Sequence, residues 1–568
     1  MAHKLDAING STLLLGLIAI TAIVTPWNNL EPVGLPKLAT LTVTVSLTGL
    51  LLILFHKSPS KFPRVFFLST LIAIALSLFN VLINSQFISE RIFGVSGRNF
   101  GALTFICLLL TSIISFSISE NMDSKKLLSA IKLSSFLVAI YFFTQLQGLD
   151  RAAWVDAYGG VPSSTLGNPN FVSAFVSIGF VLTLPLLLAR QTKLPIRMLI
   201  VFISALELYV TVESNSFQGL AIILLGFFYV ALSFLSPVLL KLSRGYLAAF
   251  FSLATLITGF FLYRFQDPLS ISSVTIRARL VYWEAGLAMG LDSPIFGKGF
   301  DYFGESYFLF RSERAAIGSP SLYSNSAHNY FIDLLASGGI PLFLATLLPI
   351  LLVLRGKFLS IVRLQTFSEE NKAMEAVIRG LFLAWLGFLF QALLSPFNIA
   401  LAYLGFLLTG FLYGRFGGIK RNEESSTKGF KRRAIPRGGA KKYGKNGVIL
   451  KVFLAPLFIL LPILGFQPLI ADAKFRDGIE QGNGETIYRI ALSQPKNFQL
   501  MRYAAQTFIE NQREDLATPI IRQMVEQNPG NLAGWRLLEG VSKTEAEKAE
   551  IRAKIRALDP KNPELENS

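Results

Sequence analysis

The 568-residue sequence is poor in cysteine, in histidine and in charged residues of either sign. The single cysteine, Cys107, excludes a disulfide within the chain and zinc sites built from cysteines. Only three histidines occur, His3, His56 and His328. Charged residues make up 16% of the chain, whereas a soluble domain has about 25%. These shortages exclude a soluble enzyme and leave few side chains for acid–base chemistry.

Apolar residues dominate what is present, at 52% of the chain. They gather in long runs, which predicts an all-α polytopic membrane helical bundle, because a run of about 20 apolar residues crosses the roughly 30 Å hydrocarbon core as a helix. Thirteen spans are predicted, near 11–27, 35–55, 65–84, 101–120, 127–147, 168–189, 196–213, 217–239, 246–264, 328–354, 375–394, 397–415 and 448–471.

The basic loops predict the orientation. The rule that cytoplasmic loops are rich in Lys and Arg puts the N-terminus inside and the C-terminal tail outside. The richest loop, 415–445, has eleven basic and two acidic residues. Such a run could bind nucleic acid, but its position between two spans favours a cytoplasmic linker on anionic headgroups, with no nucleic acid as partner. We interpret the first span as a retained anchor.

The chain divides by composition. The long loop 265–327 keeps eleven aromatic residues, so we expect it to fold over the spans. The predicted segments are 1–195 (transmembrane helices), 196–355 (a core including that loop), 356–415 (transmembrane helices), 416–447 (basic linker), 448–471 (last span) and 472–568 (tail).

The tail 472–568 is charged and has a repeat of Pro-x-Asn at 495–497, 529–531 and 560–562. The prolines are 34 and 31 residues apart, a period typical of tetratricopeptide helix pairs. So few units are marginal alone. We therefore expect this small extracytoplasmic domain to lean on the membrane body or on a protein partner.

Two of the four arginines in the long loop, Arg277 and Arg279, stand two residues apart. On a helix, Arg279 and Trp283 share a face. A guanidinium suits phosphate because its planar fork gives paired, charge-assisted hydrogen bonds. The alternative is that these residues anchor the chain at the headgroups.

The one histidine at the outer face is His328, which precedes the apolar run 330–354. A neutral imidazole can take a proton from an attacking hydroxyl, although a structural hydrogen-bonding role is the alternative. Asn329 suits a helix N-cap. Asp333 is an ionisable group inside a span, which is a functional candidate by default. The pair ending at Gly339, followed by a proline, predicts a break in the helix.

Weaker polar signals stand at other predicted span starts on the outer face. Arg98 lies in Gly97-Arg98-Asn99-Phe100-Gly101, and Gln218 lies in the polar turn 213–219. A simple turn is the alternative for the second.

Together these motifs resemble the O-antigen ligase and O-antigen polymerase (Wzy-type) superfamily. The family motif of His-[Asn/Ser/Gln], nine residues and Gly is matched by His328-Asn329 and Gly339, although Leu342 replaces the small or polar residue that follows. Upstream, Arg279 to Trp283 and Pro294-x-x-Gly-x-Gly299 also match. The resemblance covers about 90–395.

The resemblance implies an enzyme of the bacterial inner membrane that transfers a glycan from undecaprenyl diphosphate to an acceptor hydroxyl at the outer leaflet. It implies His328 and Arg279 as catalytic residues, and Arg277, Arg279, Arg98 and Gln218 as ligands of the diphosphate. Asn329, Asp333, Trp283 and Gly339 would support them. No metal or other cofactor is expected.

One departure concerns the turn at 214–219, where relatives often have an arginine on the carrier diphosphate. This chain has Gln218 there, so we expect Arg98 or Arg277 to compensate. The acceptor could be a lipid, a protein or a polysaccharide.

Other functions remain open. A Wzy-type polymerase and a protein O-oligosaccharyltransferase would use the same residues. A polysaccharide or lipid transporter or flippase predicts inverted repeats with paired broken helices, and only one such break, at 338–341, is seen. A scaffold that displays the tail is a third class.

Overall fold

The protein is seen in a computed structural model that describes residues 2–55, 64–84, 87–152, 158–189, 192–239, 271–318, 320–362, 369–417 and 445–565. Over these residues the chain is helical and forms no strand, which confirms the predicted all-α class. The predicted span 246–264 and most of the basic linker lie outside the described residues.

The body consists of α1 (Ala2–Ala22), α2 (Gly34–Phe55), α3 (Arg64–Ile83), α4 (Ile88–Phe93), α5 (Ala102–Ile118), α6 (Ser124–Leu146), α7 (Pro169–Leu188), α8 (Leu194–Glu213), α9 (Phe217–Leu239), α11 (Ile271–Asp292), α12 (Phe303–Phe310), α13 (Glu313–Gly318), α14 (Tyr330–Val362), α15 (Glu369–Leu394), α16 (Ile399–Gly417) and most of α18 (Lys445–Glu480). The tail adds α19 (Gly484–Leu492), α20 (Phe498–Glu510), α21 (Glu514–Gln527), α22 (Leu532–Val541) and α23 (Glu545–Leu558).

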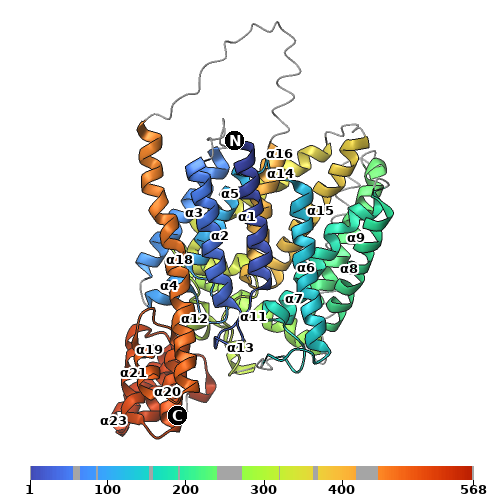
Figure 1. Ribbon diagram of the computed structural model, residues 1–568. Helices are drawn as coiled ribbons and strands as arrows, with labels where there is room; N and C mark the ends of the chain where they lie inside the picture. The colour runs from blue at the N-terminus through green and yellow to red at the C-terminus, as the bar shows by residue number, and fades with distance from the viewer. Residues whose placement is uncertain are drawn as a thin grey trace.

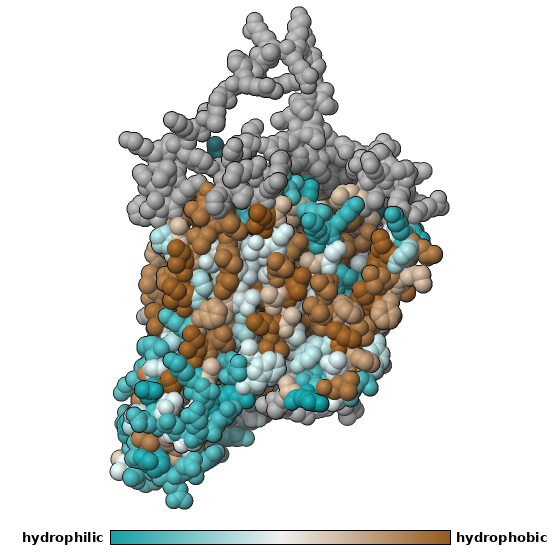
Figure 2. Space-filling view, in the orientation of Figure 1, coloured by the Kyte–Doolittle hydropathy of each residue, from teal (hydrophilic) through white to brown (hydrophobic). Residues whose placement is uncertain are grey.

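Nine helices among the described residues are long and apolar enough to cross a membrane, and three shorter apolar helices accompany them. Each overlaps one of the predicted spans. Figure 2 shows the result on the surface, where hydrophobic residues form a broad band over the helices and the tail is mainly hydrophilic. Large apolar side chains on α3, α8 and α18 face outward, as lipid-facing residues do.

Small residues let the central helices approach closely. A Cβ added to Gly380 of α15 would lie 2.1 Å from the carbonyl oxygen of Leu182 on α7. One added to Gly410 of α16 would lie 2.0 Å from the carbonyl oxygen of Ser112 on α5. These contacts are typical of helix packing in membranes, where small residues line the interface.

A buried ion pair joins three helices of the body. Lys132 Nζ on α6 lies 2.5 Å from Glu207 Oε2 on α8. The other oxygen of Glu207 accepts from Ser135 Oγ at 2.6 Å, and Lys132 also donates to the carbonyl of Gly179 on α7 and to Ser204 Oγ. Both charges are therefore fully enclosed by partners.

The break predicted in the helix near Gly339 is confirmed. Gly339 has φ +73° within α14, a conformation that suits glycine, and its φ and ψ are non-helical. The freed groups bond to the segment after α11: Ile340 N–H donates to the Pro294 carbonyl, and Lys298 N–H donates to the Ala336 carbonyl, both at 2.8 Å. The two motif segments thus form one packed unit.

The tail continues directly from the membrane body. Helix α18 runs without interruption from Lys445 to Glu480, so the boundary predicted at 471–472 falls inside a helix (Figure 1). Two helix pairs, α20 with α21 and α22 with α23, follow α19, and Asn497 and Asn531 each precede the first helix of a pair. The Oδ1 of Asn497 accepts from the N–H of Leu500, and that of Asn531 accepts from the N–H of Gly534. The tetratricopeptide assignment itself remains a prediction.

The tail lies against the body, as expected for so few units. Arg311, between α12 and α13, forms an ion pair with Asp559 of the tail, with both oxygens accepting from Nη2 at 2.7 and 2.9 Å. Both side chains are fully buried. Lys561 Nζ donates to the Arg311 carbonyl at 2.7 Å. The tail and the N-terminus lie at opposite ends of the helix bundle (Figure 1).

Candidate active site

His328 is held at the entrance to α14. Its φ of +51° is unusual for a residue with a side chain. The backbone around it is fixed on both sides, because His328 N–H donates to Ser326 Oγ at 3.2 Å and Asn329 Oδ1 accepts from Phe331 N–H at 3.0 Å. Asn329 is thus the N-cap that its residue type predicts.

The imidazole of His328 stacks on the ring of Tyr282 from α11, with centroids 5.5 Å apart and an angle of 27° between the planes. Burial, together with the positive charges of Arg279 and Arg98, lowers the pKa of His328 to about 4. The imidazole is therefore neutral at ordinary pH, in the form that accepts a proton.

Helix α11 brings Arg279 to this imidazole. Arg279 lies one helical turn before Tyr282 and Trp283, and burial lowers its pKa. No described residue forms an ion pair with Arg279. The indole Nε1 of Trp283 is buried and has no hydrogen-bond partner among the described residues. Arg277 lies on the same helix, but its side chain is outside the described residues.

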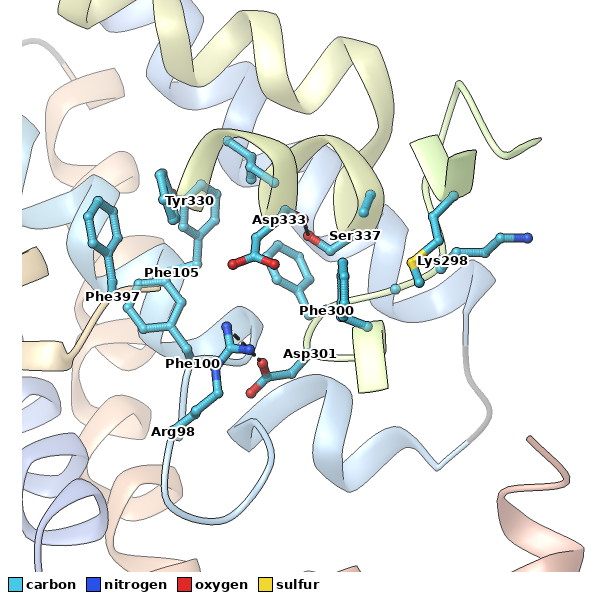
Figure 3. A pocket seen from close by; sticks show the side chains of 15 residues that line it. Arg98, Phe100, Phe105, Lys298, Phe300, Asp301, Tyr330, Asp333, Ser337 and Phe397 are labelled. Atoms are coloured by element: carbon cyan, nitrogen blue, oxygen red, sulfur yellow. Dashed lines mark hydrogen bonds and ion pairs between the residues drawn. The ribbon is translucent and has the colours of Figure 1, made fainter. Parts of the chain in front are cut away.

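Arg98, in the segment between α4 and α5, also contributes to the site, and its guanidinium is already bound to protein groups. Its Nη1 donates to the carbonyl oxygen of Asn325, three residues before His328, and its Nη2 lies 3.4 Å from Asp301 Oδ1 (Figure 3). Asp301 in turn accepts from Val95 N–H at 2.8 Å. This network fixes the guanidinium in place.

Asp333 faces Arg98 across a small cavity. One carboxylate oxygen accepts from Ala327 N–H at 2.6 Å, so Asp333 holds the backbone next to His328. The other oxygen is buried and has no hydrogen-bond partner among the described residues. Figure 3 shows Arg98 and Asp333 pointing into the same space from different walls. The cavity also has Phe100, Phe105, Phe300, Lys298, Tyr330, Ser337 and Phe397 in its wall.

The structure therefore brings His328, Arg279, Arg98 and Asp333 together. Gln218 lies at the start of α9, where a Cβ added to the next residue, Gly219, would lie 2.1 Å from Ser173 Oγ of α7. Its amide is buried and both polar atoms lack a hydrogen-bond partner among the described residues. No contact described for Gln218 joins it to His328.

Sequence reasoning missed three supporting residues, Asp301, Asn80 and Tyr282. Asn80 of α3 donates to the carbonyls of Phe296 and Ser337 and so joins the two motif segments. Asp301 follows the Gly297-x-Gly299 motif by two residues, which is the one signal that could have pointed to it. No group of His, Cys, Asp and Glu side chains suited to a metal ion occurs in the described part of the chain.

The multi-pass apolar bundle, with a half-buried histidine in the electrostatic range of two half-buried arginines, defines a membrane protein with a candidate transferase site. Residues 172–347 match the family model of the O-antigen ligase, which supports the resemblance seen in the sequence. The match includes His328, Arg279 and Gln218, whereas Arg98 lies before it. No curated protein matches the chain.

The family match supports a membrane glycan ligase or polymerase type of function and a glycosyl-transferring enzyme. It extends over a region that includes α7 to the break in α14. The motifs at 277–342 that carry the resemblance lie inside that range.

Proposed function

We propose that this protein transfers a glycan from a polyprenyl diphosphate, of the undecaprenyl type, to an acceptor hydroxyl at the outer leaflet. The observation that carries the proposal is the neutral imidazole of His328 held in the electrostatic range of Arg279 and Arg98. An acceptor proton and a diphosphate leaving group need these two kinds of side chain, one neutral and basic and one cationic.

In the reaction that we propose, the acceptor oxygen attacks the anomeric carbon and its proton passes to His328. The bond between that carbon and the diphosphate oxygen breaks, and its electron pair leaves with the diphosphate. Arg279 stabilises the negative charge that develops there. Attack from the far side inverts the configuration of the anomeric carbon.

The contacts of the two described arginines suggest different roles. Arg98 is already bonded to Asn325 and Asp301, so it shapes the cavity and contributes a fixed positive potential. Arg279 has no ion-pair partner among the described residues, so it is the guanidinium with free donors for a diphosphate. Arg277 and Gln218 remain further candidates for diphosphate binding.

Asp333 is a positioning residue in this proposal. Its bond to Ala327 N–H holds the chain in the left-handed turn at His328, a conformation that costs about 1–3 kcal/mol when the surroundings do not enforce it. Trp283 and Gly339 support the site through α11 and through the break in α14.

The orientation belongs to the same proposal. With the N-terminus in the cytoplasm, α11, α12 and the tail stand on the extracytoplasmic side of the bacterial inner membrane, where a flipped lipid-linked glycan is exposed. Ligase, polymerase and protein O-oligosaccharyltransferase activities differ only in the acceptor.

The experiment is reconstitution of the full chain in proteoliposomes with labelled polyprenyl-diphosphate glycan and with lipid, polysaccharide and protein acceptors. Product masses identify the acceptor. His328→Ala and Arg279→Ala should lose transfer, and Arg314→Ala, an exposed arginine of α13, is the matched control. Full transfer by either site variant removes that residue from the mechanism.

A further inference from the structure

A second, larger cavity lies where the tail meets the body. Its volume is about 330 Å³, within the range of about 300–1,000 Å³ that is typical of small-ligand sites. The body contributes α4, α12 and the loop that leads to His328, and the tail contributes the first turns of α20 and α22. We call it the junction cleft.

Two buried carboxyl groups of the body line the junction cleft, those of Glu90 and Glu305. Glu90 is only 5% exposed. The Oε2 atoms of both residues are buried without a hydrogen-bond partner among the described residues. An unmet buried polar atom costs about 1–3 kcal/mol, so this arrangement is one that a ligand with hydroxyl donors would relieve.

Aromatic rings and guanidinium groups complete the wall. The ring of Tyr323 stacks on Phe308, with centroids 5.8 Å apart and planes at 25°. From the tail come Phe498 and the side chains of Arg502 and Arg536, neither of which forms an ion pair with a described residue. Carboxyl acceptors, guanidinium donors and flat apolar rings together match a saccharide, which presents many hydroxyls and apolar ring faces.

The junction cleft shares walls with the small cavity between Arg98 and Asp333, which we call the reaction cavity. Helix α12 lines the reaction cavity with Phe303 and the junction cleft with Gly304 and Glu305. The loop after α4 likewise contributes Ser96 to the junction cleft and Arg98 to the reaction cavity. A chain bound in the junction cleft is therefore close to the reacting groups without occupying their place.

We propose that the junction cleft binds sugar units of the acceptor, next to the hydroxyl that reacts. This inference rests on the proposed function. The donor is held at the reaction cavity through its diphosphate, whereas a saccharide acceptor has no such charged group and needs a site of its own. The tail would then be part of the acceptor site and not a module for recruiting proteins.

Binding to the full chain in nanodiscs tests the proposal, with oligosaccharides released from the envelope polysaccharide of the producing cells as the probe. Arg502→Ala and Arg536→Ala should each raise the Kd about 10-fold, since a hydrogen bond to a charged group contributes about 1.5–3 kcal/mol. Arg489→Ala is the control, because Arg489 is exposed on α19 and does not line the junction cleft. Equal binding by wild type and both cleft variants overturns the proposal.

A crosslinking measurement identifies the class of ligand directly. A benzophenone amino acid at Gln499, which lines the junction cleft, should capture material that is resistant to protease and sensitive to periodate, and the same group at Arg489 should not. A protease-sensitive adduct would show a polypeptide in the junction cleft and overturn the saccharide. His328→Ala separates the two proposals: it should lose transfer and keep oligosaccharide binding, whereas the cleft variants should lose binding and keep slow transfer.

Discussion

Two buried charged clusters of the body differ in how their hydrogen bonds are met. In the cluster of Lys132 and Glu207, both carboxylate oxygens accept hydrogen bonds and the ammonium group has several acceptors. At the candidate active site, one oxygen of Asp333 has no hydrogen-bond partner among the described residues, and Arg279 forms no ion pair with a described residue. Both clusters are buried, so burial does not distinguish them.

The difference indicates what each cluster is for. A fully bonded ion pair inside a helix bundle has nothing left to offer a ligand and holds α6, α7 and α8 together. Groups whose bonding capacity is unused are prepared for a substrate, and the energetic cost of leaving them unmet is recovered when it binds. Substitutions in the two clusters test this difference.

The largest effect is expected from removing half of the ion pair. Lys132→Met leaves Glu207 buried and unpaired, which should cost about 3–5 kcal/mol of stability. Thermal unfolding in detergent measures the loss. Replacing both residues, Lys132→Met with Glu207→Leu, should restore most of the stability, and a double variant as unstable as the single one would contradict a purely structural role.

Arg279→Ala should lower activity without lowering stability. Removing a donor that stabilises charge in the transition state lowers kcat by about 10²–10³-fold, while the unfolding temperature should stay near that of the wild type because Arg279 forms no ion pair with a described residue. The assay is single-turnover transfer of labelled glycan. Arg279→Lys keeps the charge without the planar fork, so its kcat should lie between those of the wild type and Arg279→Ala.

The pH dependence should reveal the displaced pKa of His328. Because burial and two arginines disfavour the cation, the imidazole remains a base down to about pH 4. The kcat/KM of the free enzyme should therefore stay level from pH 8 to about pH 5 and fall only near pH 4. Bound diphosphate is negative and favours the cation, so the acid limb of kcat should lie at higher pH. An acid limb of kcat/KM at pH 6.5 would mean that the histidine is exposed.

The smallest of the effects is expected at Asp333. Asp333→Asn keeps an oxygen that can accept from Ala327 N–H, whereas Asp333→Ala loses it. We expect Asp333→Asn to retain most activity and Asp333→Ala to lose about 10-fold, since one hydrogen bond contributes about 1 kcal/mol or more. Equal losses in both variants would show that the charge, and not the backbone contact, is what Asp333 supplies.

Much of this fold could be predicted from sequence because lipid leaves few options. Apolar runs of span length must be helices, and the Gly338-Gly339-Ile340-Pro341 stretch must break one. The repeated asparagines of the tail likewise act as helix caps, as their residue type favours. Helix α18 crosses the predicted boundary at 471–472 because its apolar and polar halves have no helix-breaking signal there.

The site was predictable in part. His328, Arg279 and Asp333 stand out by their type and their place, but their convergence depends on contacts between distant segments. Asn80 illustrates the limit: it lies in an apolar run as one polar residue among many, and its role is visible only where it meets two carbonyls from the motif segments. Gln218 shows the reverse, since its motif position suggested a contact with the site that the structure does not describe.

The unbroken course of α18 sets a fixed height for the tail above the lipid. A helix of 36 residues has a length of about 1.5 Å per residue, and the Arg311–Asp559 pair stops it from tilting away. Under the proposed function, a polymeric acceptor then reaches His328 only if its free end extends as far from the bilayer as the tail holds it. Shortening or lengthening α18 by whole turns should then change which lengths of the acceptor polymer react.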